Sequence, residues 1–268
     1  MTIRCFSSAG TDDTTRVVFL GWTTSATDYI EIVGWDFPTN GIFDATKYVF
    51  VHSGTGGSVG LLIQEEYVRV DHLQVVVNSS GTSSIYGIGV SVIGAANDIR
   101  ISNCIVKAGA TMTGTGEGIG IWFSDTDLIA KVWNCVIYGF ISASDPADAG
   151  FRAFGPGAVP ATLDIYNCTM FGNYHGCSLG FAGGTRTVKN CAVFNNTDDF
   201  NGTITIDYCA SDDGDGTNPQ DFTAEATDWN AVFTDYTVGN VTLKNYTTAP
   251  CAVGKGVDNP GSGLYSND

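Results

Sequence analysis

The chain has 268 residues, including 34 glycines and only 7 prolines, and its formal net charge is −16. With 15% charged and 43% hydrophobic residues, it is too apolar for intrinsic disorder and too rich in glycine for a helical protein. Phosphate recognition needs clusters of Lys and Arg, so we expect no nucleic acid and no membrane as partner, and a run of 18 apolar residues that could span a bilayer is lacking.

Residues 1–60 are expected to form the opening coils of a repeat structure, with a turn around residues 35–41. The first six residues, MTIRCF, lack the apolar segment of a signal peptide and are typical of a strand already under way. We therefore interpret the chain as a fragment of a longer protein or as one expressed domain.

Residues 61–211 contain a two-part repeat that predicts regular coils. One part is a strand led by glycine, which begins at Gly87, Gly118, Gly150 and Gly176. The other is an alternating apolar strand that ends in Asn-Cys, with degenerate copies at His72-Leu73 and Tyr208-Cys209. From Gly to the following Cys the spacing is 17, 17, 18 and 15 residues, whereas from Cys to the next Gly it is 14, 15 and 8. One half of constant length and one of variable length indicate stacked coils of parallel strands with a variable loop.

This G-I-x-V/I pattern followed by N-C, over about residues 60–210, resembles the right-handed parallel β-helix proteins of the pectate-lyase-like superfamily. The segments 2–32 and 67–80 also look like β-helix proteins of phage genomes and environmental bacteria, mostly without assigned activity. The resemblance implies an all-β fold, a right-handed parallel β-helix (β-solenoid), as a single domain over residues 1–268. It implies a structural ladder of stacked amides at Asn103, Asn134, Asn167 and Asn190. Homotrimers are common among phage spikes of this fold, although nothing in this sequence specifies one.

Alternation along the strands predicts an inward column of cysteines. Its members are Cys104, Cys135, Cys168, Cys191 and Cys209. Free thiols are favoured over disulfides between coils, because a buried Cys packs as a small hydrophobe and the Cβ vectors of parallel neighbours are poorly aimed at each other. The absence of a C-x-x-C pair argues against zinc. Cys5 and Cys251 are left without an assigned role.

Outward positions predict a carbohydrate-binding platform. Trp122, Arg152 and Phe154 are expected on neighbouring coils and one face, and a second outward row contains Trp133 and Tyr166. Sugar rings stack their C–H faces on aromatic rings while polar groups bond the hydroxyls. In the alternative reading, the variable loops 107–117 and 140–149 fold over these aromatic side chains.

Two enzymatic alternatives have weaker motifs. A glycoside hydrolase needs two carboxylates across the scissile bond, for which Asp198 and Asp199 are the candidates, with His175 nearby but no Arg-x-Lys motif. A pectate-type lyase would use Arg152 as its base, although no acidic residue takes a matching outward position on the flanking strands.

Residues 212–268 lose the repeat and are expected to form an irregular last coil and a cap. Asp212, Asp213 and Asp215 lie in a glycine-containing loop that resembles a calcium loop but lacks the glutamate of an EF-hand. Calcium is thus the one cofactor that we consider, and a solvated acidic turn is the alternative.

The sequence favours a non-catalytic surface or virion structural protein that binds glycan, in an extracellular place or on a virion surface. Its expected partners are glycan and other virion or surface proteins. The alternative is a polysaccharide lyase or glycoside hydrolase acting in a groove on the β-helix, and a purely architectural role is a third reading.

Overall fold

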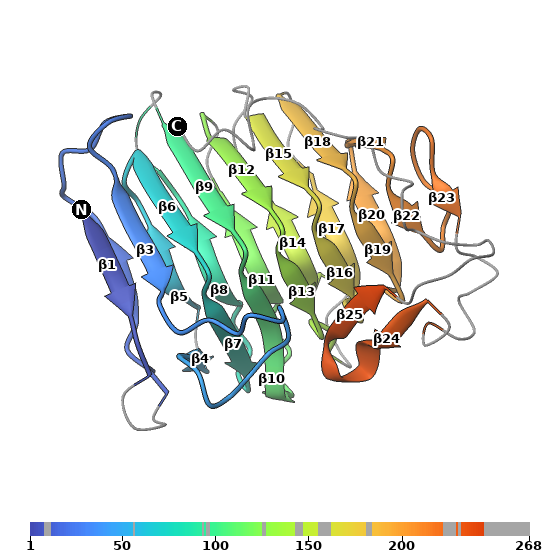
Figure 1. Cartoon of the computed structure of the whole chain (residues 1–268), viewed down its shortest axis with the longest axis horizontal. Coiled ribbons are helices and arrows are strands. Elements are labelled where there is room, and N and C mark those ends of the chain that lie inside the picture. Colours follow the sequence, from blue (N-terminus) through green and yellow to red (C-terminus); the bar gives the residue numbers. More distant parts are fainter. Residues whose placement is uncertain are drawn as a thin grey trace.

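The computed structural model describes residues 1–7, 12–55, 57–92, 94, 97–124, 127–142, 147–154, 162–180, 184–221, 229 and 232–243. Its strands form a right-handed parallel β-helix, whose coils follow one another along the long axis of the molecule (Figure 1). Three parallel sheets make the walls, and a regular coil gives one strand to each of them in turn. The predicted fold class is therefore confirmed.

We number the sheets in the order in which a coil enters them. Sheet 1 consists of β1 (Thr2–Cys5), β3 (Ile30–Gly34), β6 (Tyr67–Asp71), β9 (Asp98–Ser102), β12 (Ile129–Trp133), β15 (Thr162–Tyr166), β18 (Thr185–Lys189) and β21 (Thr205–Asp207). Sheet 2 consists of β4 (Phe50–Gly54), β7 (Gln74–Ser79), β10 (Ile105–Met112), β13 (Val136–Tyr138), β16 (Thr169–Phe171), β19 (Ala192–Phe194), β22 (Ala210–Ser211) and β23 (Gln220–Asp221). Sheet 3 consists of β2 (Val17–Phe19), β5 (Ser58–Ile63), β8 (Ile85–Val90), β11 (Gly118–Phe123), β14 (Ala149–Ala153), β17 (His175–Leu179) and β20 (Asp198–Gly202).

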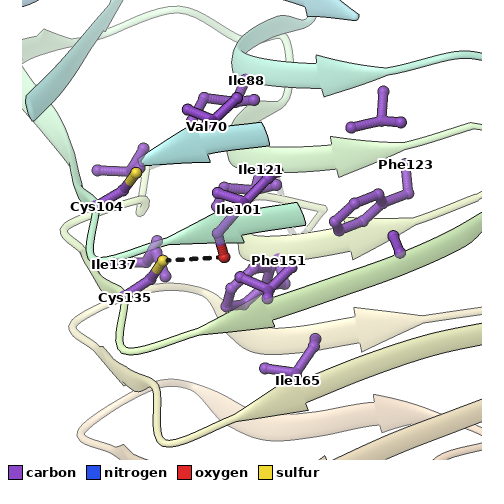
Figure 2. Close-up of a cluster of buried hydrophobic side chains, with 14 of the residues drawn as sticks. Val70, Ile88, Ile101, Cys104, Ile121, Phe123, Cys135, Ile137, Phe151 and Ile165 are labelled. Atoms are coloured by element: carbon purple, nitrogen blue, oxygen red, sulfur yellow. Dashed lines mark hydrogen bonds between the residues drawn. The ribbon is translucent and has the colours of Figure 1, made fainter. Parts of the chain in front are cut away.

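The interior of the solenoid is filled by apolar columns from all three sheets. Figure 2 shows Ile101 of sheet 1, Ile137 of sheet 2 and Phe151 of sheet 3 inside the coils, and each of these side chains is fully buried. Each such side chain contributes roughly 1.5–3 kcal/mol through its removal from water. In the described part of the chain, no helix is long and apolar enough to cross a bilayer.

The turn between sheets 1 and 2, here the 1–2 corner, has the same backbone in six coils. Its central residue has a φ of 51° to 55° at His72, Asn103, Asn134, Asn167, Asn190 and Tyr208. Asn is favoured there because it tolerates the left-handed region better than other residues with a side chain. The amide of Asn134 donates to Oδ1 of Asn103 at 3.2 Å, and Asn103 donates to Oδ1 of Asp71 at 2.7 Å.

A cysteine follows the left-handed residue in five coils, and each of these thiols is at most 2% exposed. The thiol donates to the carbonyl two residues earlier, as Cys104 does to Ser102 at 3.0 Å and Cys135 to Trp133 at 3.3 Å. Figure 2 shows Cys104 and Cys135 in adjacent coils, with a longer contact from Cys135 to the carbonyl of Ile101. Burial raises the pKa of both thiols well above the ordinary value. The seven cysteines of the described residues are all free thiols.

Next to the turn between sheets 2 and 3, here the 2–3 corner, residues near the start of the sheet 3 strands form an inward column of glycines at Gly87, Gly120, Gly150 and Gly176. A Cβ on Gly120 would lie 2.7 Å from the carbonyl oxygen of Gly150 and 2.9 Å from the side chain of Ile137. The repeat pattern treats Gly118 as the equivalent of Gly87, which is wrong, because Gly118 pairs with Ile85 and Gly120 is the residue next to Gly87. Period-two alternation fails here, where the strand bends at the corner.

An antiparallel hairpin covers the outer face of sheet 2 near the C-terminal coils (Figure 1). It consists of β24 (Phe233–Asp235), the 3₁₀ turn η2 (Tyr236–Val238) and β25 (Asn240–Leu243). Phe233 stacks on Phe194 at 4.5 Å, and Phe194 continues a ladder through Phe171 to Tyr138. The described part of the expected cap thus packs on the side of the solenoid, where it removes the aromatic rings of sheet 2 from solvent. Residues 244–268 of that cap lie outside the described residues.

Candidate functional site

Aromatic and charged side chains gather on the outer face of sheet 3. Trp122 of β11 pairs in register with Arg152 of β14, and the ring of Tyr86 stacks on Trp122 with centroids 4.6 Å apart. Phe154 follows β14, is 60% exposed, and lies 5.7 Å from the guanidinium carbon of Arg152. The structure therefore brings the sequence candidates Trp122, Arg152 and Phe154 together and adds Tyr86 to them.

An ion pair stands beside the aromatic rings. Arg152 lies 3.0 Å from Oε1 of Glu117 and donates to the carbonyl of Ala147 at 2.7 Å. The hydroxyl of Ser84 donates to the other carboxylate oxygen of Glu117 at 3.3 Å. Arg152 thus has an acidic neighbour, although this residue does not occupy a matching outward position on a flanking strand, where Trp122 lies. Glu117 comes from the turn before β11, which strand alternation does not place.

The phenol of Tyr86 completes this cluster. Burial, opposed by a hydrogen bond with Ser84, raises its pKa above the ordinary value, so Tyr86 stays neutral and its hydroxyl both donates and accepts. We call Tyr86, Glu117, Trp122, Arg152 and Phe154 the sheet 3 cluster. Tyr86 and Glu117 were missed from the sequence, and their one signal is their position just before the glycine-led strands.

The second predicted aromatic row lies on another wall. Trp133 of β12 and Tyr166 of β15 are in register on sheet 1, in the column that also holds Asp71, Ser102 and Lys189. Tyr166 is only 4% exposed. It is therefore not available as a sugar platform, because its ring is covered, and Trp133 does not join the sheet 3 cluster.

The hydrolase candidates are not arranged around an open cleft. Nδ1 of His175 lies 3.1 Å from Oδ2 of Asp198 but forms no hydrogen bond with it. Asp199 is fully buried, so a polysaccharide cannot reach its carboxyl group. Arg152 lies on β14, which β17 separates from the strand of these aspartates. The structure therefore does not assemble Arg152, His175, Asp198 and Asp199 into one site.

Asp199 occupies the place of the glycine column in the last full coil and meets the loop that contains Asp212. Its Oδ1 accepts from Asn196 at 2.8 Å, and its Oδ2 accepts from the backbone N–H of Asp212 at 3.2 Å. Burial, together with the carboxyl group of Asp212, raises the pKa of Asp199 to about 9. Asp199 is thus protonated at neutral pH.

The loop expected to bind calcium folds through hydrogen bonds of its own. The backbone N–H groups of Asp213 and Asp215 donate to the hydroxyl of Ser211 at 3.1 and 3.3 Å, and Asp212 faces Asp199. Among the described residues, no group of three or more His, Cys, Asp or Glu side chains is arranged to hold a metal ion. Calcium binding at Asp212, Asp213 and Asp215 stays a prediction that this geometry does not favour.

Compared with known proteins, the chain matches no family model, and no curated protein and no solved structure matches it significantly.

Proposed function

We propose that this protein is a non-catalytic β-helix surface or virion structural protein that binds glycan at the sheet 3 cluster. The observation that carries the proposal is the stacked pair of Tyr86 and Trp122 beside the exposed ring of Phe154 and the ion pair of Arg152 with Glu117. Aromatic faces suit the C–H face of a sugar ring, and the flanking charged groups suit its hydroxyls.

The scaffold supports this role because the cluster stands on a rigid wall. Trp122 and Arg152 project from paired central strands, and their inward neighbours Ile121 and Phe151 are fully buried. Side chains held on such strands need little ordering when they bind a ligand. The same proposal includes an extracellular or virion location and partners among virion or surface proteins. It also includes kinship with pectate-lyase-like β-helices.

The proposal is tested by assaying binding and turnover on one panel of neutral and acidic polysaccharides, with and without calcium. A glycan array measures binding, and reducing-sugar and unsaturated-product assays measure turnover. We expect binding without turnover. Turnover would overturn the non-catalytic assignment and favour the lyase or hydrolase alternative, whereas neither binding nor turnover would leave an architectural role.

Variants locate the binding surface. Phe154→Ala removes an exposed ring and should leave folding intact, while Trp122→Ala removes the half-buried partner of Tyr86. We expect each variant to weaken binding at least about tenfold, the equivalent of roughly 1.4 kcal/mol. Trp133→Ala on sheet 1 is the matched control and should bind as the wild type does. Equal losses in all three variants would contradict the location.

A further inference from the structure

A long insertion, held in place by hydrogen bonds, covers the 1–2 corner of the early coils. After β3 the chain takes residues 35–49 to reach β4, whereas later coils turn this corner within a few residues. Buried Gln74 holds the insertion, because its amide donates to the carbonyls of Asp44 and Tyr48 at 3.0 and 3.1 Å and accepts from the N–H of Asp44 at 2.7 Å. Lys107 of β10 lies 4.6 Å from the ring of Phe43, and Figure 1 shows the loop running across to β10 and back.

A groove of about 280 Å³ lies between this insertion and the corner. The insertion lines it with Phe37, Pro38 and Thr39, and the corner lines it with His72, Asn103 and Asn134. Ligand pockets usually measure roughly 300–1,000 Å³, so this groove suits a ligand about the size of one sugar ring. In solenoid proteins, insertions in single repeats often form the binding face.

Under the insertion, a histidine replaces one of the asparagines at the 1–2 corner. His72 occupies the position that Asn occupies in the next four coils, with the same left-handed backbone. Its Nδ1 lies 2.6 Å from Oδ2 of Asp71, whose other oxygen accepts from Ser102 and Asn103, both at 2.7 Å. This carboxylate orients the imidazole and leaves Nε2 for a ligand. The ring of Phe37 meets that of His72 edge to face at 5.1 Å.

We propose that this groove is a second binding site, separate from the sheet 3 cluster, for a polyhydroxylated ring of monosaccharide size. Nε2 of His72 bonds a ring hydroxyl, and the amides of Asn103 and Asn134 donate their second N–H groups to others. The ring of Phe37 packs on the C–H face of the ligand. The ladder alone does not require a histidine here, since an asparagine with the same backbone serves in the coils that follow.

Binding is tested by adding glucose, galactose, N-acetylglucosamine and galacturonate one at a time to isotope-labelled protein. The imidazole signals are followed by NMR, and the chain has only three histidines, so His72 is readily assigned. We expect one of these sugars to shift the His72 signals saturably in the millimolar range, while the signals of His52 and His175 stay in place. Titrations with no saturable shift of His72 would overturn the proposal.

Two variants separate this site from other surfaces. His72→Asn restores the ladder residue and should fold normally, and its binding is followed through the side-chain amide signals of Asn103 and Asn134, since this variant has no imidazole at position 72. We expect it to weaken binding at the groove about tenfold, as for loss of one hydrogen bond. Phe37→Ala should weaken binding as well. Phe154→Ala lies in the sheet 3 cluster, so it should leave the sugar-induced shifts of the His72 signals at the groove unchanged. Undiminished binding to His72→Asn, or loss of binding in Phe154→Ala, would contradict the proposed site.

Discussion

The 1–2 corner and the 2–3 corner both recur along the solenoid but are built differently. At the 1–2 corner, one left-handed residue and one buried thiol recur almost unchanged. At the 2–3 corner, the glycine column ends in Asp199, and the loops before it differ in length. At the 1–2 corner, one backbone conformation makes the turn, so residues that tolerate it are enough to specify the corner. At the 2–3 corner, the turn depends on packing against neighbouring elements, so its residues differ from coil to coil.

The 2–3 corner also contains an amide ladder that the sequence repeat does not predict. Oδ1 of Asn196 accepts from the backbone and side-chain nitrogens of Asn173 at 2.9 and 3.0 Å, and Asn173 accepts from the backbone of Phe140 at 3.0 Å. In the sequence, this ladder is indicated only weakly, by an aromatic residue that is followed by a residue with a left-handed backbone, as in Phe171-Gly172 and Phe194-Asn195. The ladder is fully buried at Asn173, so it links coils inside the wall.

The largest effect is expected from filling the glycine column. Gly120→Ala places a Cβ within 3 Å of Ile137 and of the carbonyl of Gly150, so we expect about 3 kcal/mol of destabilisation from overpacking. Gly180→Ala is the matched control, because its Cβ would meet nothing within 4 Å, and it should be neutral or slightly stabilising. Urea unfolding of both variants makes the measurement, and equal stability of the two would contradict a packed column.

A smaller effect is expected at the 1–2 corner, where the backbone matters most. Asn134→Ala should destabilise by about 2 kcal/mol, because Ala tolerates a positive φ poorly and the bond to Asn103 is lost. Asn134→Gly loses the same bond but accepts the backbone, so it should cost about 1 kcal/mol. The difference in unfolding free energy between the two variants, measured by urea unfolding, gives the cost of the positive φ for a residue with a Cβ. An Ala variant more stable than the Gly variant would contradict this cost.

The smallest effect is a change with pH at Asp199. Its folded pKa of about 9 lies above the ordinary 3.8, so its contribution to stability is fully present at acidic pH and is lost as the pH rises through about 9. Asp199→Asn keeps an acceptor for Asn196 and places a donor toward Asp212. Relative to wild type, it should gain about 1.4 kcal/mol between pH 6 and 7.

Another buried aspartate at the same corner provides the contrast. Asp148 accepts from the backbone N–H groups of Gly118 and Ser142, both at 2.6 Å. Asp148→Asn turns one acceptor into a donor that faces an N–H group, so it should destabilise the protein at pH 6 and at pH 8. If thermal unfolding showed the same response to pH in both variants, the raised pKa of Asp199 would be disproved.

The sequence by itself determined the solenoid, because period-two alternation, the Asn-Cys turn and the constant Gly-to-Cys spacing are local properties that repeat. It also placed Trp122, Arg152 and Phe154 on one face, since strand alternation carries that information. Only the tertiary structure decided that Glu117 pairs with Arg152, that Tyr166 is covered, and that Asp199 meets Asp212. These contacts join loops to strands of other coils, and neither loop path nor corner bend follows from a local pattern.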